Sequence, residues 1–181
     1  MANIKLINVI ETLPWHKTKK WGKRNLSLID RIVVHQMASP QYPGFKDIEN
    51  NNKYFITPSP NNHISKDGCP HIPYHIIIDT EYRVYWCNRF EDLTWHCKGN
   101  NTNSIGVCVM GSFDGPSFKG KDKQPMLDQV QSLKKILDNL IEYQFNPLTK
   151  NDVYGHGELS SYKKNCPGIY ILNWLKNWRN N

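Results

Sequence analysis

The feature that most constrains the fold of this chain is a short apolar run, "RIVVHQ", at residues 31 to 36. Consecutive β-branched and apolar residues of this kind are typical of a buried strand. A second run, "SIGVCVMG" at residues 104 to 111, has the same character. Both runs therefore predict buried strands, and the first places His35 at the carboxyl end of its strand.

Other segments predict helices and further strands around these two. "YHIIID" and "RVYWCN" flank the short "TEY", which predicts a β-hairpin over residues 74 to 88. Apolar residues at three and four spacing, with a proline in the first turn, predict a helix over 125 to 143. We expect a last short strand over 152 to 156 and a closing helix over 169 to 178. Because a hairpin is antiparallel, this order predicts an α/β fold with a mixed central β-sheet flanked by helices.

The segment from 41 to 73 is rich in proline, asparagine and glycine. This composition predicts a long, partly helical excursion over the surface, and loops of this length in a compact domain are usually functional. His63 and His71 lie in this segment, so we expect both at the surface. His16, further upstream, has no context that suggests a role.

Length and charge narrow the class of protein. A chain of 181 residues is expected to form one domain over residues 1–181. Its first residues have neither the apolar core of a signal peptide nor a membrane span, so we expect cytoplasmic synthesis without membrane insertion. A formal charge of +7 favours polyanionic partners such as nucleic acid, anionic lipid or bacterial wall polymer. The run "HKTKKWGKR" matches no nucleic-acid module and predicts a solvated basic face, so we expect no nucleic-acid partner. We also favour a monomer.

The chain contains five cysteines, an odd number without the tight spacing of disulfide-stapled modules. At least one thiol must therefore do something other than pair. We expect four of them to be reduced and partly buried: Cys69, Cys87, Cys97 and Cys108. The fifth, Cys166, lies ten residues after His156.

His35, His156 and Cys166 form a candidate metal site. Both histidines follow predicted strands, where side chains from distant segments converge. Two imidazoles and one thiolate leave a fourth tetrahedral position for water, which is the arrangement of a catalytic zinc site. By spacing alone the alternative is favoured, namely surface or core histidines beside a buried thiol, because any of seven histidines could substitute.

Four segments of the chain together resemble a known family. "IVVHQ", "PYHIIID", "TWHCKGNNTNSIGVCVMGSF" and "GHGELSSYKKNCPG" occur in the order, and at about the intervals, of zinc-dependent N-acetylmuramoyl-L-alanine amidases of type 2. That family includes amidase-type phage lysozymes and animal peptidoglycan recognition proteins. The resemblance covers roughly residues 30 to 175 and implies the mixed α/β fold of these proteins.

The resemblance implies roles for individual residues. The ligands of a single Zn²⁺ would be His35, His156 and Cys166. Tyr74 and Lys164 match residues that assist the reaction in the phage branch. The resemblance places Trp95 and His96 along the substrate groove and Asn103 near it. His75 is a further candidate for substrate contact, although a regular strand would turn it to the face opposite Tyr74.

Two departures from the family pattern affect these roles. In many phage and animal members the cysteine lies eight residues after the second histidine, whereas here it lies ten residues after it, so Lys163 competes with Lys164 for the catalytic role. The cytoplasmic recycling branch has the longer spacing, but with an aspartate in place of Cys166 and a catalytic glutamate near the position of Cys108. The cysteines found here favour the phage-like arrangement of tyrosine and lysine.

The expected function is therefore cleavage of the amide between N-acetylmuramic acid and L-alanine in bacterial peptidoglycan. We expect a phage or prophage endolysin, or a bacterial autolysin, that acts on the cell wall after release from the cytoplasm. The alternative is a peptidoglycan-binding module without catalysis, since some animal relatives bind wall fragments after losing the cysteine. Cys166 is present and favours the enzyme.

Overall fold

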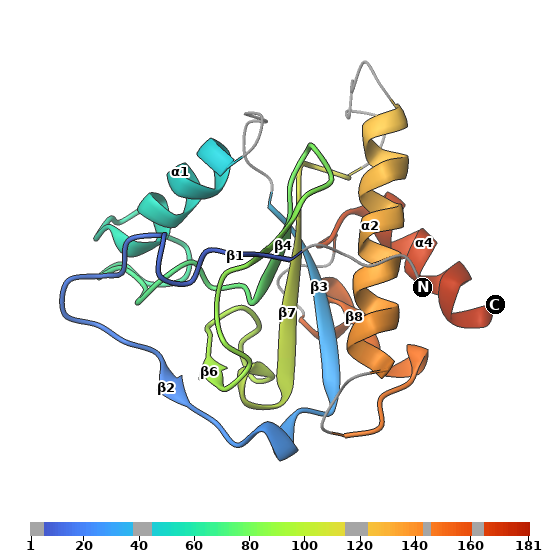
Figure 1. The fold of residues 1–181 in the computed structure, drawn as a ribbon, viewed down its shortest axis with the longest axis horizontal. Coiled ribbons are helices and arrows are strands. Elements are labelled where there is room, and N and C mark those ends of the chain that lie inside the picture. Colours follow the sequence, from blue (N-terminus) through green and yellow to red (C-terminus); the bar gives the residue numbers. More distant parts are fainter. Residues whose placement is uncertain (1–5, 38–44, 115–122, 143–145, 161–164) are drawn as a thin grey trace.

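The two apolar runs pair with each other in the middle of a six-stranded sheet (Figure 1). The computed structural model describes residues 6–37, 45–114, 123–142, 146–160 and 165–181. In it, β3 (Arg31–Met37) and β7 (Ser104–Met110) run parallel over their whole length, with His35 opposite Cys108. Both predicted strands are thus confirmed, and His35 lies two residues before the end of its strand.

The remaining strands complete a mixed sheet in the order β1-β5-β4-β7-β3-β8. β8 (Val153–Gly155) lies parallel to β3, and β4 (Ile76–Ile78) lies parallel to β7. β4 pairs antiparallel with β5 (Val84–Trp86), which confirms the predicted hairpin. Two features were not predicted: β1 (Leu6–Asn8), which pairs with β5, and a separate two-stranded sheet formed by β2 (Gly22–Lys23) and β6 (Asp92–Leu93).

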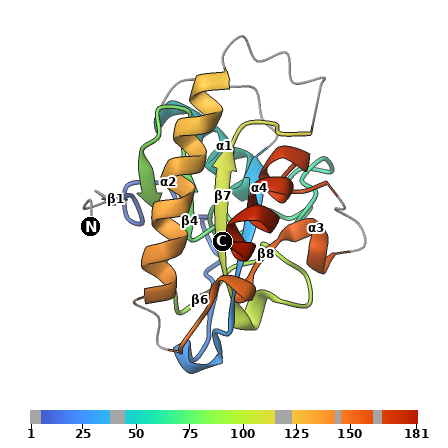
Figure 2. The same cartoon turned by 90° about the vertical axis from the view of Figure 1, so that its right-hand side faces the viewer.

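Helices cover both faces of the sheet. α2 (Lys123–Glu142) and α4 (Ile169–Asn180) lie on one face, and α1 (Phe45–Ile56) lies on the other (Figures 1 and 2). The short α3 (His156–Leu159) follows β8 directly. The helices predicted over 125–143 and 169–178 are confirmed. No helix within the described ranges is both long and apolar enough to cross a membrane.

The two faces of the sheet carry two separate apolar cores. Because side chains alternate along a strand, Val34 faces the helices α2 and α4, whereas His35 faces the other side. The first core is formed by strand residues and the two long helices, including Val34, Val107, Leu133, Leu137, Ile171 and Leu175. The second lies under α1 and the amino-terminal segment, and includes Met37, Ile48, Phe55, Ile72, Tyr74 and Cys108. His35 therefore belongs to the face that α1 covers.

The segment from 45 to 73 is partly helical as predicted, but it is more than a surface excursion. Ile48, Phe55 and Ile72 are buried in the second core. His63 is exposed as expected, whereas the prediction for His71 is wrong, because its side chain is fully buried. The proline and asparagine content of the segment predicts its turns. It does not show which side chains of the segment are buried, and so it did not reveal the burial of His71.

His71 is held in a polar cluster that ties the amino-terminal segment to the sheet. Its ring stacks on Trp15 with centroids 4.5 Å apart. Its Nδ1 lies 3.1 Å from Asn88 Oδ1, which also accepts a hydrogen bond from Trp21 Nε1 at 2.8 Å. Burial lowers the pKa of His71 to about 4, so the ring is neutral at pH 7.

The first prediction concerns the pH dependence of stability. His71 has a folded-state pKa of about 4 against an ordinary value of 6.5, so the unfolded chain binds the proton more tightly. Its contribution to the free energy of unfolding is therefore present above pH 6.5 and is lost as the pH falls, by roughly 3 kcal/mol at pH 4. We expect His71→Asn to be less stable than wild type at pH 7, with a difference that narrows toward pH 4 in urea titrations. Parallel stability profiles would show that His71 is not held neutral.

The second prediction concerns the turn between Cys166 and α4. Gly168 has φ +94°, and a Cβ there would lie 2.4 Å from the carbonyl carbon of Phe113. Gly168→Ala combines backbone strain with a clash against main chain, and we expect a loss of about 2–5 kcal/mol in the free energy of unfolding. Gly99 has a similar φ of +86° but nothing within 4 Å of such a Cβ, so Gly99→Ala is the matched control. Equal losses for the two variants in urea titrations would contradict the close approach at Gly168.

Candidate metal centre and active site

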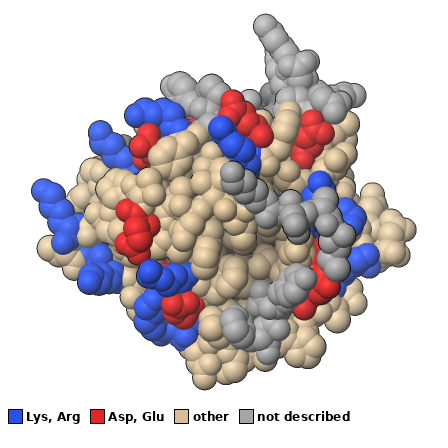
Figure 3. All heavy atoms as spheres, in the orientation of Figure 1, with Lys and Arg blue, Asp and Glu red and all other residues tan. Residues whose placement is uncertain are grey.

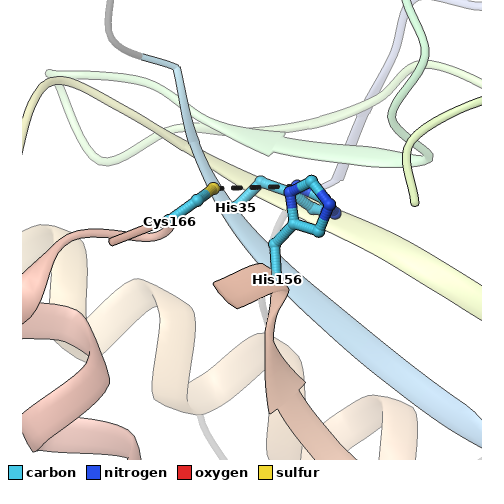
Figure 4. Close-up of side chains that lie close together, drawn as sticks. All are labelled: His35, His156 and Cys166. Atoms are coloured by element: carbon cyan, nitrogen blue, oxygen red, sulfur yellow. Dashed lines mark hydrogen bonds between the residues drawn. The ribbon is translucent and has the colours of Figure 1, made fainter. Parts of the chain in front are cut away.

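Three side chains from distant segments converge beside the carboxyl ends of β3 and β8 (Figure 4). They are His35 near the end of β3, His156 at the start of α3 and Cys166 in the turn before α4. Their candidate ligand atoms all lie within 4.8 Å of one another. Cys166 Sγ is 3.9 Å from His35 Nδ1, which identifies the imidazole nitrogen that faces the thiol.

The sheet register explains why the two histidines meet. Gly155, the last residue of β8, is opposite Val34, so His156 emerges next to His35. A Cβ on Gly155 would lie 2.4 Å from Leu172 Cδ2 and 2.8 Å from Pro167 Cδ. The absence of a side chain at this glycine therefore lets α4 and the Cys166 turn approach β8 closely enough to bring the thiol to the histidines.

The donor set fits a transition metal. Zn²⁺ binds imidazole and thiolate ligands well, whereas magnesium and calcium prefer oxygen ligands. Three protein ligands also leave one position of a tetrahedral zinc site open. His35 is buried, and this desolvation, followed by the charges of His96 and His156, holds its pKa well below the ordinary value. The ring is therefore neutral at pH 7, which is the form that ligates a metal.

Tyr74 lies directly beside this cluster. Its ring centroid is 5.1 Å from that of His35, and its side chain is only 7% exposed. Burial, and then the neighbouring Cys108 and Cys166, raises the pKa of the Tyr74 phenol well above its ordinary value. The hydroxyl thus remains protonated at pH 7, and it makes a side-chain hydrogen bond with Cys108.

Trp95 presents an aromatic surface near the site. Its side chain is 38% exposed and meets Trp21 edge to face, with ring centroids 5.3 Å apart. Trp21 is buried and anchored by its hydrogen bond to Asn88. The exposed indole of Trp95 therefore packs against a buried, hydrogen-bonded neighbour, which limits its movement.

Two expected substrate contacts need correction. His75 is fully buried, with Nδ1 accepting from the Gly106 amide at 3.0 Å and Nε2 lying 3.1 Å from the Asp92 carbonyl oxygen. His96 is 5% exposed, and its two ring nitrogens face His35 and Ser104. Both rings are therefore buried, and their nitrogens face other groups of the protein.

Asn103, expected near the substrate groove, precedes β7 and faces Asp30. Asn103 donates from Nδ2 to the Asp30 carboxylate, at 3.0 and 3.2 Å to its two oxygens. This contact is at the amino-terminal ends of β3 and β7, whereas His35 lies opposite Cys108, further along both strands. Lys163 and Lys164 lie outside the described residues.

Arg24 has a structural role that the sequence did not suggest. The basic run around it was expected to be solvated, and Lys17, Lys20 and Lys23 are exposed, but Arg24 is 8% exposed. Its guanidinium donates to the carbonyl oxygens of Phe90 at 2.9 Å, Asn101 at 2.6 Å and Ser104 at 2.5 Å. These bonds hold the loop that carries Trp95 and His96. Burial lowers the pKa of Arg24 to about 10, which still leaves it charged.

Charge does not single out one binding surface. Figure 3 shows lysine and arginine side chains along the rim of one face, interspersed with acidic ones. Several of the basic residues pair with neighbours, such as Lys23 with Asp92 at 2.5 Å. On this face the basic side chains therefore do not gather into one patch.

Comparisons with known sequences agree with this geometry. The family model described as N-acetylmuramoyl-L-alanine amidase matches residues 24–169. The endolysin of Escherichia phage T7 is 29% identical over 155 residues, covering 84% of this chain and 87% of the endolysin. The 1,6-anhydro-N-acetylmuramyl-L-alanine amidase AmpD of Haemophilus influenzae is 27% identical over 97 residues, or 54% of this chain. That match spans about half of AmpD, at 52%.

Solved structures share the fold. Drosophila peptidoglycan recognition protein SD superposes with a TM-score of 0.74 at 17% identity, covering 98% of this chain and 96% of that one. The complex of peptidoglycan recognition proteins LCa and LCx with tracheal cytotoxin gives 0.71 at 22% identity, covering 96% and 95%. The match to the family model includes the segments that supply His35, His156 and Cys166. The chain belongs to the N-acetylmuramoyl-L-alanine amidase family.

Proposed function

We propose that this protein is a zinc-dependent peptidoglycan hydrolase that cleaves the amide bond between N-acetylmuramic acid and L-alanine. The observation that carries the proposal is the convergence of His35, His156 and Cys166 to within 4.8 Å, beside the protonated phenol of Tyr74. Membership of the amidase family supports the same bond as the target. One Zn²⁺ per chain is the expected cofactor.

Each residue of the site has a definite task in this proposal. A bound zinc ion supplies Lewis-acid activation of water at neutral pH. His35, His156 and Cys166 would hold the ion. The hydroxyl of Tyr74 donates a hydrogen bond to the oxygen that gains negative charge when the amide carbonyl is attacked, and the ammonium of Lys164 offsets the same charge.

The substrate is expected to lie along the surface that carries Trp95. A sugar ring can stack on an exposed indole, and the support from Trp21 fixes the position of that indole. The likeness to the T7 endolysin along most of both chains supports a phage or prophage endolysin, with a bacterial autolysin as the related possibility. Either acts on the cell wall after release from the cytoplasm.

The second candidate is a peptidoglycan-binding module without catalysis. It is favoured by the fold shared with peptidoglycan recognition proteins, one of which is described in complex with a monomeric diaminopimelic acid-type peptidoglycan. Such a module requires the Trp95 surface but not a metal. The complete donor set around Cys166 supports the enzyme over the binding module.

The third prediction tests the enzyme directly. Zinc-loaded protein should clear a suspension of purified peptidoglycan sacculi and release stem peptides that begin at L-alanine, leaving the glycan intact. A chelator should abolish clearing and added Zn²⁺ should restore it. Cys166→Ala should lose zinc and lower the clearing rate by at least a hundredfold, on the order of what the loss of a catalytic metal or oxyanion stabiliser costs.

The matched control is Cys97→Ala, which removes a buried thiol that is not part of the three-ligand cluster. It should keep both zinc and activity. Turbidity and mass spectrometry of the products report the two quantities. Zinc-replete wild type that pellets with sacculi without clearing them would favour the binding module, and cleavage within the glycan would refute the proposed bond.

The fourth prediction distinguishes the two lysines near Cys166. Lys164→Ala should retain stoichiometric zinc and lower kcat about a hundredfold, because it removes a cation from the developing negative charge and no metal ligand. Lys163→Ala is the matched control and should remain near wild type. The reverse result, with Lys163→Ala inactive and Lys164→Ala active, would move the catalytic role to Lys163.

A further inference from the structure

The ring nitrogen of His35 that does not face the thiol, Nε2, contacts the buried imidazole of His96. His35 Nε2 lies 3.0 Å from His96 Nδ1, and the two rings are nearly perpendicular at 87°. His35 is 2% exposed and His96 is 5% exposed, so water does not compete for this contact. His35 is therefore held at both nitrogens, by His96 on one side and by the candidate metal position on the other.

Only one proton arrangement suits a metal at that position. His35 Nδ1 faces Cys166 Sγ and must offer a lone pair, so the proton of the neutral ring must be on Nε2. His96 Nδ1 must then accept that proton's hydrogen bond. The proton of His96 is consequently on its own Nε2, which points toward Ser104.

The surroundings of Ser104 agree with this direction. His96 Nε2 lies 3.2 Å from Ser104 Oγ and 3.4 Å from its carbonyl oxygen. The Ser104 hydroxyl has its own acceptor, the Asn100 carbonyl oxygen at 2.5 Å, so its oxygen is left to accept from His96. The reverse arrangement would turn the hydroxyl proton to His96 and leave the Asn100 carbonyl without it.

The strand beneath His96 is shaped to receive the ring. Gly106 of β7 lies under it, and a Cβ there would be 2.8 Å from Cγ and 2.9 Å from Nδ1 of His96. An alanine at this position would force the ring to move, because core packing leaves no room for one more methyl group. Gly106 thus fixes where the acceptor nitrogen of His96 lies.

We propose that His96 is a positioning residue for the metal centre, which accepts a hydrogen bond from His35 Nε2 and so fixes His35 in the tautomer and orientation that present Nδ1 to the metal. Ser104 fixes the tautomer of His96 in turn, and Gly106 fixes its place. This inference rests on the proposed zinc site. Hydrogen-bond partners behind a ligating histidine commonly contribute about ten- to a hundredfold in metal affinity.

The first experiment measures zinc affinity by competition with a chromogenic chelator. His96→Leu removes the acceptor and should weaken Zn²⁺ binding about ten- to a hundredfold. His96→Asn places an amide oxygen where Nδ1 was and should recover most of that loss. Gly106→Ala keeps every hydrogen-bonding group but displaces the ring, so it should weaken binding as well.

The matched control is His71→Asn, which changes a buried histidine of the second core that belongs neither to the three-ligand cluster nor to the contacts of His96. It should bind Zn²⁺ as wild type does. Equal affinity in wild type, His96→Leu and Gly106→Ala would overturn the inference. If His96→Leu does not fold, the comparison of Gly106→Ala and His96→Asn with wild type still decides it.

A second measurement separates this inference from the proposed function. Nitrogen-15 spectra of the histidine rings in metal-free wild type should show His35 protonated at Nε2 and unprotonated at Nδ1. Protonation at Nδ1 would overturn the positioning role whatever the zinc affinity. Wild type that fails to bind Zn²⁺ but shows the expected tautomer would refute the proposed function and leave the role of His96 in orienting His35 supported.

Discussion

The parallel pairing of β3 with a strand on each side is the constraint on which the rest of the structure depends. Its register with β7 places Cys108 beside His35, and its register with β8 delivers His156 from the adjacent strand end. The hydrogen bonds of the ladder hold these positions more tightly than loops would. A shift of one residue in β3 would turn His35 to the opposite face, into the core under α2 and α4.

The two faces of this sheet are used differently. The face under α2 and α4 carries a contiguous apolar core that packs against the strands. The face under α1 combines apolar residues with polar groups, among them His35, His75 and Asn88. Burying a polar group costs free energy unless the group has a hydrogen-bond partner. The side-chain amide of Asn88 has four such partners, two carbonyl oxygens and two ring nitrogens. The surroundings of the site are thereby made rigid.

Much of this arrangement could be predicted from the sequence, and the failures have physical causes. The strands at 31–36 and 104–111 and the helix near 125–143 follow from apolar runs and periodicity. The convergence of His35, His156 and Cys166 was implied by the resemblance to the amidase family, because spacing alone favoured the alternative. By contrast, β1, β2 and β6 span two or three residues each, too few for any period to be visible. The burial of Arg24, His71 and His96 depends on loops that cover them from distant parts of the chain, which local composition cannot reveal.

The sequence separation of the three candidate ligands determines when during folding the metal site can form. The thiol of Cys166 and the imidazole of His35 are 131 positions apart in sequence, and four strands of the six-stranded sheet, β4, β5, β7 and β8, lie between them in the chain. A zinc finger gathers its ligands from one short segment and can bind metal as that segment folds. Here the loop to be closed is far longer, and contacts of this range form late in folding. An incompletely folded chain would therefore have no metal site to load, which couples the proposed zinc binding to the completed fold.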